Sequence, residues 1–138
     1  MKRIKFSKSG AVFSDCRKFR YALWRMWDGD KPLVMIIGLN PSTADEKVND
    51  PTISRCISFA RSWGYGGVCV TNLFGFRATS PTHLKAHHDP IGKENDAWVH
   101  EMAKEATIKV DEEEKIFEIR SSFFRLQKVS LRTLANLE

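Results

Sequence analysis

The sequence predicts an α/β fold, in which helices alternate with the strands of a layered sheet. Two near-continuous apolar runs of strand length, LVMIIGL at 33–39 and GVCVTNL at 67–73, indicate strands buried on both faces. Apolar residues at helical spacing fill the segment between them, from 53 to 63. This order favours a mostly parallel central sheet, to which the chain before residue 31 adds an antiparallel N-terminal portion.

The N-terminal part of the chain favours short strands. IKFSKSGAVFS at 4–14 indicates two strands around a Ser-Lys-Ser-Gly turn. FRYALWRMW at 19–27 suits a strand, although its pattern leaves a helix open. DGDKP at 28–32 then makes a turn before the first buried run.

Two helix-start signals follow the first buried run. STAD at 42–45 places an acid three residues after a hydroxyl, which is the capping-box pattern. Asp50 before Pro51 is the second signal, and Gly64 is expected to end that helix. Further helices are expected at 80–86, at 92–106 and from residue 111 onwards, with a short strand at 107–110.

Length and composition predict a single domain over residues 1–138. The longest apolar run, 33–37, is too short to cross a bilayer. The basic N-terminus lacks the apolar stretch of a signal peptide, so we expect a cytoplasmic protein with no membrane partner. Three widely spaced cysteines form no CxxC pair, and we expect no metal and no cofactor. Cys56 and Cys69 lie in apolar patterns and are expected in the core.

The turn GLNPSTAD at 38–45 is the main candidate for a site, and the alternative is plain helix punctuation. Gly38 lets a ligand approach the backbone, and Asn40 offers both a donor and an acceptor. Asn72 ends the second buried run in a similar way and converges on Asn40 if the two strands are parallel neighbours. We therefore predict Asn40 and Asp45 as catalytic residues. The predicted ligand-binding residues are Gly38, Leu39, Pro41, Ser42, Thr43, Asn72 and Arg77.

The positive charge is concentrated at the N-terminus, where residues 1–31 hold nine Lys or Arg and three Asp or Glu. The stretch CRKFRYALWRMW at 16–27 mixes basic and aromatic residues, which suits phosphate contact and base stacking. It equally suits a solvated edge strand. If nucleic acid is bound, the predicted contacts to its backbone are Arg17, Lys18, Arg20 and Arg25.

Three blocks of the sequence resemble the bacterial and phage family called domain of unknown function 1643. They are CRKFRYALWRMWD, the segment from IIGLNPSTAD to GFRAT, and IGKENDAWV. The likeness covers about residues 16–106, and the family name carries no activity.

A strand that ends in Gly-x-Asn-Pro is also similar to the first motif of mismatch-specific members of the uracil-DNA glycosylase superfamily, and VTNLFGFRATSP is similar to a second block. This resemblance implies a three-layer α/β/α sandwich. It also implies that Asn40 positions the attacking water in an enzyme that flips a base out of the stack.

The chain departs from both families after residue 110. Both carry a late segment around His-Pro, whereas residues 111–138 contain no Gly, Pro or His. A diverged, truncated or frame-shifted terminus is consistent with this departure, which leaves part of a glycosylase-like site without a counterpart.

Three functions stay open at this point, and the sequence leaves the oligomeric state open as well. The first is a nucleic-acid-related enzyme of the glycosylase-like hydrolase kind. The second is a non-catalytic module that binds DNA or a nucleotide in the crevice at GLNPSTAD. The third is a protein-interaction domain that uses the aromatic segment YALWRMW as a docking edge. The sequence contains no Gly-x-Gly-x-x-Gly, Walker loop or nucleophile elbow.

Overall fold

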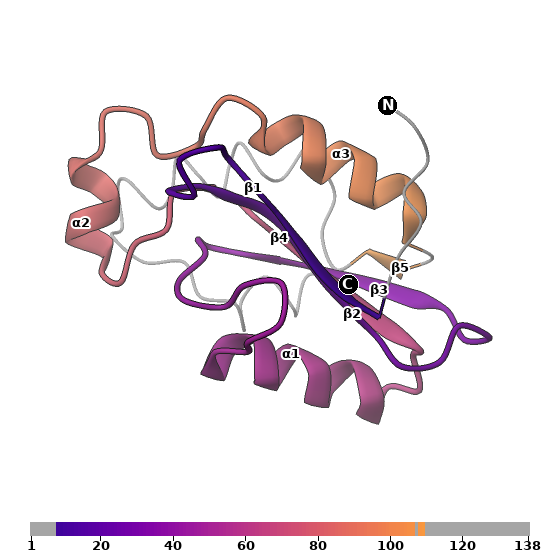
Figure 1. Cartoon of the computed structure of the whole chain (residues 1–138). Coiled ribbons are helices and arrows are strands. Elements are labelled where there is room, and N and C mark those ends of the chain that lie inside the picture. Colours follow the sequence, from indigo (N-terminus) through magenta and orange to yellow (C-terminus); the bar gives the residue numbers. More distant parts are fainter. Residues whose placement is uncertain (1–7, 107, 110–138) are drawn as a thin grey trace.

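The computed structural model describes residues 8–106 and 108–109, which form an open mixed sheet with helices packed against it (Figure 1). The prediction of an α/β protein is confirmed. The strand order across the sheet is β1-β2-β4-β3-β5. In chain order the elements are β1 (Ser9–Phe13), β2 (Arg20–Met26), β3 (Leu33–Gly38), α1 (Pro51–Ser62), β4 (Gly67–Asn72), α2 (Pro81–Ala86), α3 (Asn95–Glu105) and β5 (Ile108–Lys109).

The sheet is divided into a parallel and an antiparallel part. β3 pairs in parallel with β4 and with β5. β2 pairs antiparallel with β1 and with β4. The parallel β3–β4 pair and the antiparallel N-terminal portion are confirmed. Of the four pairings among the described strands, the two made by β3 are parallel and the two made by the N-terminal strand β2 are antiparallel.

The two faces of the sheet bury separate apolar clusters. On one face α1 packs Ile53, Cys56 and Ala60 against side chains of β2, β3 and β4. On the other face α3 packs Val99 and Met102 among a second set that includes Cys69. Figure 1 shows α1 and α3 on opposite sides of the sheet. This arrangement explains the unbroken apolar runs, since both faces of β3 and β4 are covered. The prediction that Cys56 and Cys69 are core residues is confirmed.

The segment YALWRMW is an internal strand. β2 forms ladders with β1 on one side and β4 on the other, and six of its seven residues are buried. The choice between strand and helix is thereby resolved in favour of the strand. The hypothesis of an aromatic docking edge is wrong, because this strand has no free edge within the described sheet.

The helix starts follow local capping chemistry at two of three predicted positions. α1 begins at Pro51 with Asp50 as its N-cap, and Ser80 caps α2 by accepting from the His83 N–H. Gly64, with φ of +82°, follows the end of α1 as predicted. The capping box at 42–45 is wrong, because that segment forms an irregular loop.

Several predictions concern residues that the structure does not describe. They are the strand before residue 7, the helix from residue 111 and the departure from the family pattern in the C-terminal segment. Among the described elements the longest helix, α1, has twelve residues. None of these helices combines the length and apolarity needed to span a bilayer.

Candidate functional site

A cavity of about 210 Å³ lies where β3 and β4 end. In the parallel register Gly38 is opposite Asn72, and Asn40 follows two residues later. All three residues line the cavity, because the carboxyl ends of parallel neighbours meet at one sheet edge. The predicted convergence of Gly38, Asn40 and Asn72 is confirmed.

The predicted turn supplies one wall of this cavity, but not all of its residues reach it. Leu39, Pro41 and Ser42 are among the residues that line it. Thr43, Asp45 and Arg77 are absent from the lining formed by the described residues. Five further residues line the cavity besides those predicted for the crevice. They are Arg20 from the start of β2, Asp50 and Thr52 at the start of α1, and the apolar residues Ile53 and Val70.

The predicted catalytic residue Asp45 closes a turn of its own outside the cavity. Its Oδ1 accepts hydrogen bonds from the backbone N–H of Val48 at 2.8 Å and of Lys47 at 2.9 Å. These bonds hold the pKa of the Asp45 carboxyl below its ordinary value. The carboxylate at the cavity is that of Asp50.

Asp50 joins the site loop to the helix behind it. Its Oδ1 accepts from the backbone N–H of Ile53 at 2.8 Å, which caps α1. Its Oδ2 accepts from the backbone N–H of Ala44 at 3.3 Å. One buried carboxylate therefore fixes both the start of the helix and the middle of the loop.

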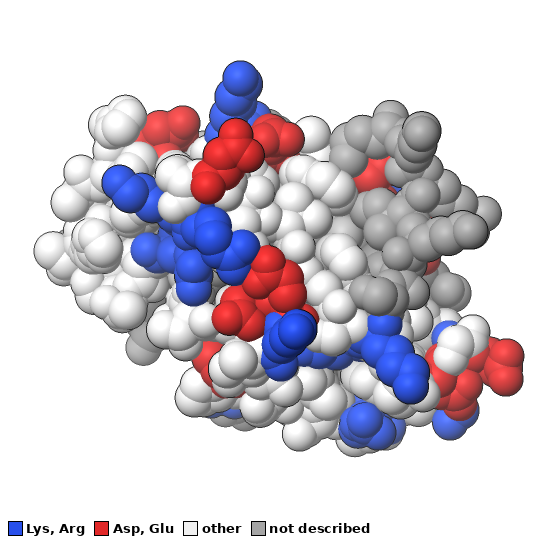
Figure 2. All heavy atoms as spheres, viewed as in Figure 1, with Lys and Arg blue, Asp and Glu red and all other residues white. Residues whose placement is uncertain are grey.

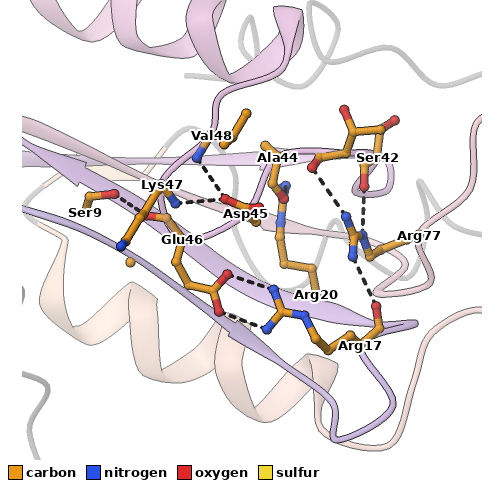
Figure 3. A network of polar contacts seen from close by, with 12 residues as sticks. Ser9, Arg17, Arg20, Ser42, Ala44, Asp45, Glu46, Lys47, Val48 and Arg77 are labelled. Carbon is orange, nitrogen blue, oxygen red and sulfur yellow. Dashed lines mark hydrogen bonds and ion pairs between the residues drawn. The ribbon is translucent and has the colours of Figure 1, made fainter.

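Four side chains hold the irregular loop at 42–49, and we call them the arginine clamp: Arg17, Arg20, Arg25 and Arg77. Figure 3 shows Arg17, Arg20 and Arg77 beside the loop. Arg77 donates from Nε to the Ser42 carbonyl at 2.8 Å and from Nη2 to the Thr43 carbonyl at 3.3 Å. Arg20 donates from Nη1 to the Ala44 carbonyl at 3.2 Å. The loop carbonyls, which no helix or strand satisfies, are thus paired by guanidinium groups.

The other two arginines hold the far half of the loop. Arg25 donates to the Asp45 carbonyl at 2.7 Å and to Asn49 Oδ1 at 2.9 Å. Arg17 and Glu46 form a two-pronged ion pair with N–O distances of 2.7 and 2.9 Å. Both partners of this ion pair are about half exposed.

These hydrogen bonds bear on the residues that the sequence predicted to contact a nucleic-acid backbone. Arg20 and Arg25 are only 1% and 7% exposed, so neither offers its guanidinium on an open surface, and their contact with a nucleic-acid backbone stays a prediction. Arg17 and Lys18 are exposed, and Arg17 is committed to Glu46. On the face shown in Figure 2, Lys and Arg side chains alternate with Asp and Glu instead of forming one continuous basic surface.

The two asparagines present different groups to the cavity. Asn40 Nδ2 donates to the Pro41 carbonyl at 3.1 Å and to the Ala78 carbonyl at 2.8 Å. Both Nδ2 hydrogens are used in this way, which leaves Oδ1 as the atom that Asn40 can offer to a ligand. Asn72 is 2% exposed, and its Nδ2 has no hydrogen-bond partner in the described part of the chain.

Arg20 is the most unusual charged group of the cavity. Its Nε has no partner among residues 8–106 and 108–109. Burial lowers the pKa of its guanidinium to about 10, while the nearby Asp50 opposes the shift. Arg20 therefore stays positively charged at neutral pH.

The sequence holds partial signals for the cavity residues that the predicted site lacked. Asp50 and Thr52 belong to the Asp-Pro helix start, which the sequence places after the first buried strand. Because α1 follows β3, its first turn returns to the same sheet edge. Arg20 lies at the beginning of a strand whose other charged residue is Arg25, and a charged residue in a buried strand points to a special environment.

Comparison with known proteins identifies one family. The family described as "Protein of unknown function (DUF1643)" matches residues 20–116. No curated protein and no solved structure matches the chain.

Proposed function

The chain belongs to the family of proteins of unknown function DUF1643, and from its cavity we propose that it binds a nucleotide, free or within a nucleic acid, at the carboxyl edge of β3 and β4. The observation that carries this proposal is the buried Asn72 amide. Its Nδ2 is buried and unpaired among the described residues, and Asn72 lines the same cavity as Asn40. An unsatisfied buried donor costs about 1–3 kcal/mol, and a ligand acceptor recovers that cost.

The chemistry of the two asparagines is complementary to a nucleobase edge. Asn72 offers N–H donors, whereas Asn40 keeps Oδ1 as an acceptor. A base edge carries carbonyl or ring-nitrogen acceptors next to N–H donors, and asparagine pairs with such edges through both of its groups. The position agrees with the rule that open α/β sheets bind ligands beyond the carboxyl ends of their strands.

The size of the cavity also favours a small group. Its volume of about 210 Å³ is below the range of roughly 300–1,000 Å³ for pockets that enclose drug-sized ligands. The cavity therefore encloses only part of a nucleotide, and the remainder of the ligand lies outside.

A base-excising hydrolase of the glycosylase kind is the second candidate, and the geometry of Asn40 favours it. Because two carbonyls fix its Nδ2, its Oδ1 is held in one place, where it can accept a hydrogen bond from a water molecule. Asp50, which lines the cavity, then takes the place of Asp45 as the nearby carboxylate.

We also propose that the fold is a three-layer α/β/α sandwich of the uracil-DNA glycosylase kind. The placement of α1 and α3 on opposite faces of the sheet supports this proposal.

The test combines binding and cleavage. Calorimetric titration of the four nucleoside monophosphates and of a short single-stranded oligonucleotide measures binding. A single-turnover assay on uracil-bearing and mismatched DNA measures cleavage. We expect the native protein to bind at least one of these ligands, and Asn40→Ala and Asn72→Leu to lose that binding while remaining folded. Cleavage by the native protein that Asn40→Ala abolishes would support the hydrolase.

Asn49→Ala is the matched control. Asn49 lies in the same loop and contributes one hydrogen bond to it, but it is outside the cavity lining. This variant should bind as the native protein does. No binding by the native protein, or binding that neither cavity variant weakens, would contradict the proposed function.

A further inference from the structure

Two arginines of β2 are almost equally buried but differ in their partners. All three nitrogens of Arg25 donate: Nε to Asn49 Oδ1, Nη1 to the Trp24 carbonyl at 2.9 Å, and Nη2 to the Asp45 carbonyl. Arg20 is 1% exposed, and within the described chain its side chain donates one hydrogen bond, to the Ala44 carbonyl. Each nitrogen of the Arg25 guanidinium is thus hydrogen-bonded, whereas Arg20 is a buried cation whose Nε has no partner in the described chain.

The surroundings of Arg20 do not neutralise it. No carboxylate of the described chain forms an ion pair with Arg20, and Asp50 is the one acidic side chain that acts on its charge from nearby. Both oxygens of Asp50 already accept backbone N–H groups. Arg25 and Arg77 add positive charge around Arg20. A buried cation in this condition is costly unless an acceptor reaches it.

A second unpaired donor lies at the same cavity. Asn72 Nδ2 is buried without a partner in the described residues, and both Arg20 and Asn72 line the cavity. They belong to neighbouring strands, β2 and β4. Two donors, one of them charged, match an oxygen-rich anionic group better than they match a neutral ring.

We propose that Arg20 and Asn72 form an oxyanion subsite, in which a phosphate or carboxylate group of the ligand accepts hydrogen bonds from Arg20 Nε and Asn72 Nδ2. The proposal rests on the proposed function and deepens it, since it selects a nucleotide over a free base or nucleoside. Asn72 Nδ2 carries two hydrogens, so one can donate to the anionic group and the other to the base. Asn40 Oδ1 remains as an acceptor for the base or for a water molecule. Arg20 acts here in ligand binding, besides its contact with the loop at Ala44.

The test compares one nucleoside with its monophosphate, and adds inorganic phosphate and acetate as minimal anions. Isothermal titration calorimetry is performed on the native protein, Arg20→Met and Arg20→Lys, with Arg61→Met as the control. Arg61 is an exposed residue of α1 whose guanidinium lies over the Trp27 ring, and it is not among the residues that line the cavity, so this control removes one positive charge away from the cavity. We expect the monophosphate to bind the native protein and Arg61→Met about tenfold or more tightly than the nucleoside. Arg20→Met should lose this difference, and Arg20→Lys should retain only part of it.

Each outcome separates the subsite from the proposed function. If the nucleoside and its monophosphate bind the native protein equally, or if Arg20→Met keeps the difference, the subsite is overturned while nucleotide binding stands. If phosphate or acetate binds and Arg20→Met abolishes it, but no nucleotide binds, the subsite stands and the proposed function fails. Stronger binding of acetate than of phosphate identifies a carboxylate ligand. No binding of any of the four compounds overturns both.

Folding of the variants is checked by thermal denaturation. Replacing a poorly partnered buried cation by an apolar side chain of similar length is expected to leave the melting temperature unchanged or to raise it. If Arg20→Met does not fold, Asn72→Leu replaces it in the same titrations, where it should lower the preference for the monophosphate. An unchanged preference in folded Asn72→Leu would overturn the part assigned to Asn72.

Discussion

Two loops follow the parallel strands β3 and β4, and they are stabilised in opposite ways. The first loop, residues 39–50, has many of its carbonyls paired by the arginine clamp. The second loop, residues 73–80, is joined to its neighbours by backbone hydrogen bonds: Leu73 N–H to the Gly38 carbonyl, Phe74 to Leu39, Gly75 to Ile91, Phe76 to Pro90, Arg77 to Lys18 and Ala78 to Pro41.

This difference determines which amino-acid substitutions each loop tolerates. Backbone hydrogen bonds persist when most side chains change, so the second loop depends weakly on the identity of its residues. The first loop depends on a few guanidinium groups that lie 20 to 35 residues away in the chain, as in the bonds of Arg25 to Asp45 and of Arg77 to Ser42. Of its own side chains, Leu39, Asn40, Pro41, Ser42 and Asp50 line the cavity.

The largest effect is expected for Arg25→Met. The substitution leaves the Asp45 and Trp24 carbonyls without their partners in a buried environment. Loss of a buried, fully bonded charged group lowers the free energy of unfolding by about 3 kcal/mol. Urea denaturation measures this, with Arg61→Met as the control for loss of charge. A change within error of the control would show that the clamp does not stabilise the fold.

Arg77→Met should act more locally. It removes the bonds to the Ser42 and Thr43 carbonyls, and the expected loss is roughly 1–2 kcal/mol. Amide hydrogen exchange should accelerate in the first loop, with little change in the second. Equal acceleration in both loops would contradict the separation between them.

Low pH should loosen the first loop through Asp45. The pKa of this carboxyl is lowered in the fold from an ordinary value of 3.8, mainly by the backbone N–H groups of Val48 and Lys47. The stabilisation is therefore complete above pH 3.8 and is lost as the pH falls through the lowered pKa. Hydrogen exchange at 45–48 should accelerate in this acidic window, whereas Asp45→Asn should show no such pH-dependent step. A step of equal size in both proteins would exclude Asp45 as its source.

The exposed end of the clamp should matter least. The ion pair between Arg17 and Glu46 is about half exposed, so Arg17→Ala should leave the melting temperature unchanged within error.

If duplex DNA binds through Arg17 and Lys18, replacing both with Ala should change the salt dependence of binding. The slope of the logarithm of the binding constant against the logarithm of the salt concentration should flatten by roughly 0.9 for each phosphate that is no longer neutralised. An unchanged slope would remove these two residues from any nucleic-acid surface.

The sequence was sufficient for features that local chemistry determines. The apolar runs at 33–39 and 67–73 identified two strands buried on both faces, and their polar ends converge as predicted. Asp50 before Pro51 marked the true start of α1, because an N-cap and a helical first residue act within a single turn.

Features that depend on distant partners were missed. Ser42 has the sequence of a capping box, but its carbonyl pairs with Arg77, and the chain stays irregular until Asp50. Arg20 and Arg25 belong to a basic and aromatic stretch that suits a solvated edge strand. The first loop covers them, and no local pattern reveals that cover.

Side-chain nitrogen NMR of the native protein during titration with a nucleoside monophosphate tests the binding site most directly. We expect the Arg20 Nε–H and Asn72 Nδ2 signals to shift together, with one dissociation constant, along with backbone amides at the cavity edge in 38–40, 42 and 52–53. Arg25 Nε–H, which is already bonded to Asn49, should shift far less. Saturable shifts confined to other surfaces, such as the exposed Phe59 and Trp63 of the α1 region, would contradict the claim that this cavity is the binding site.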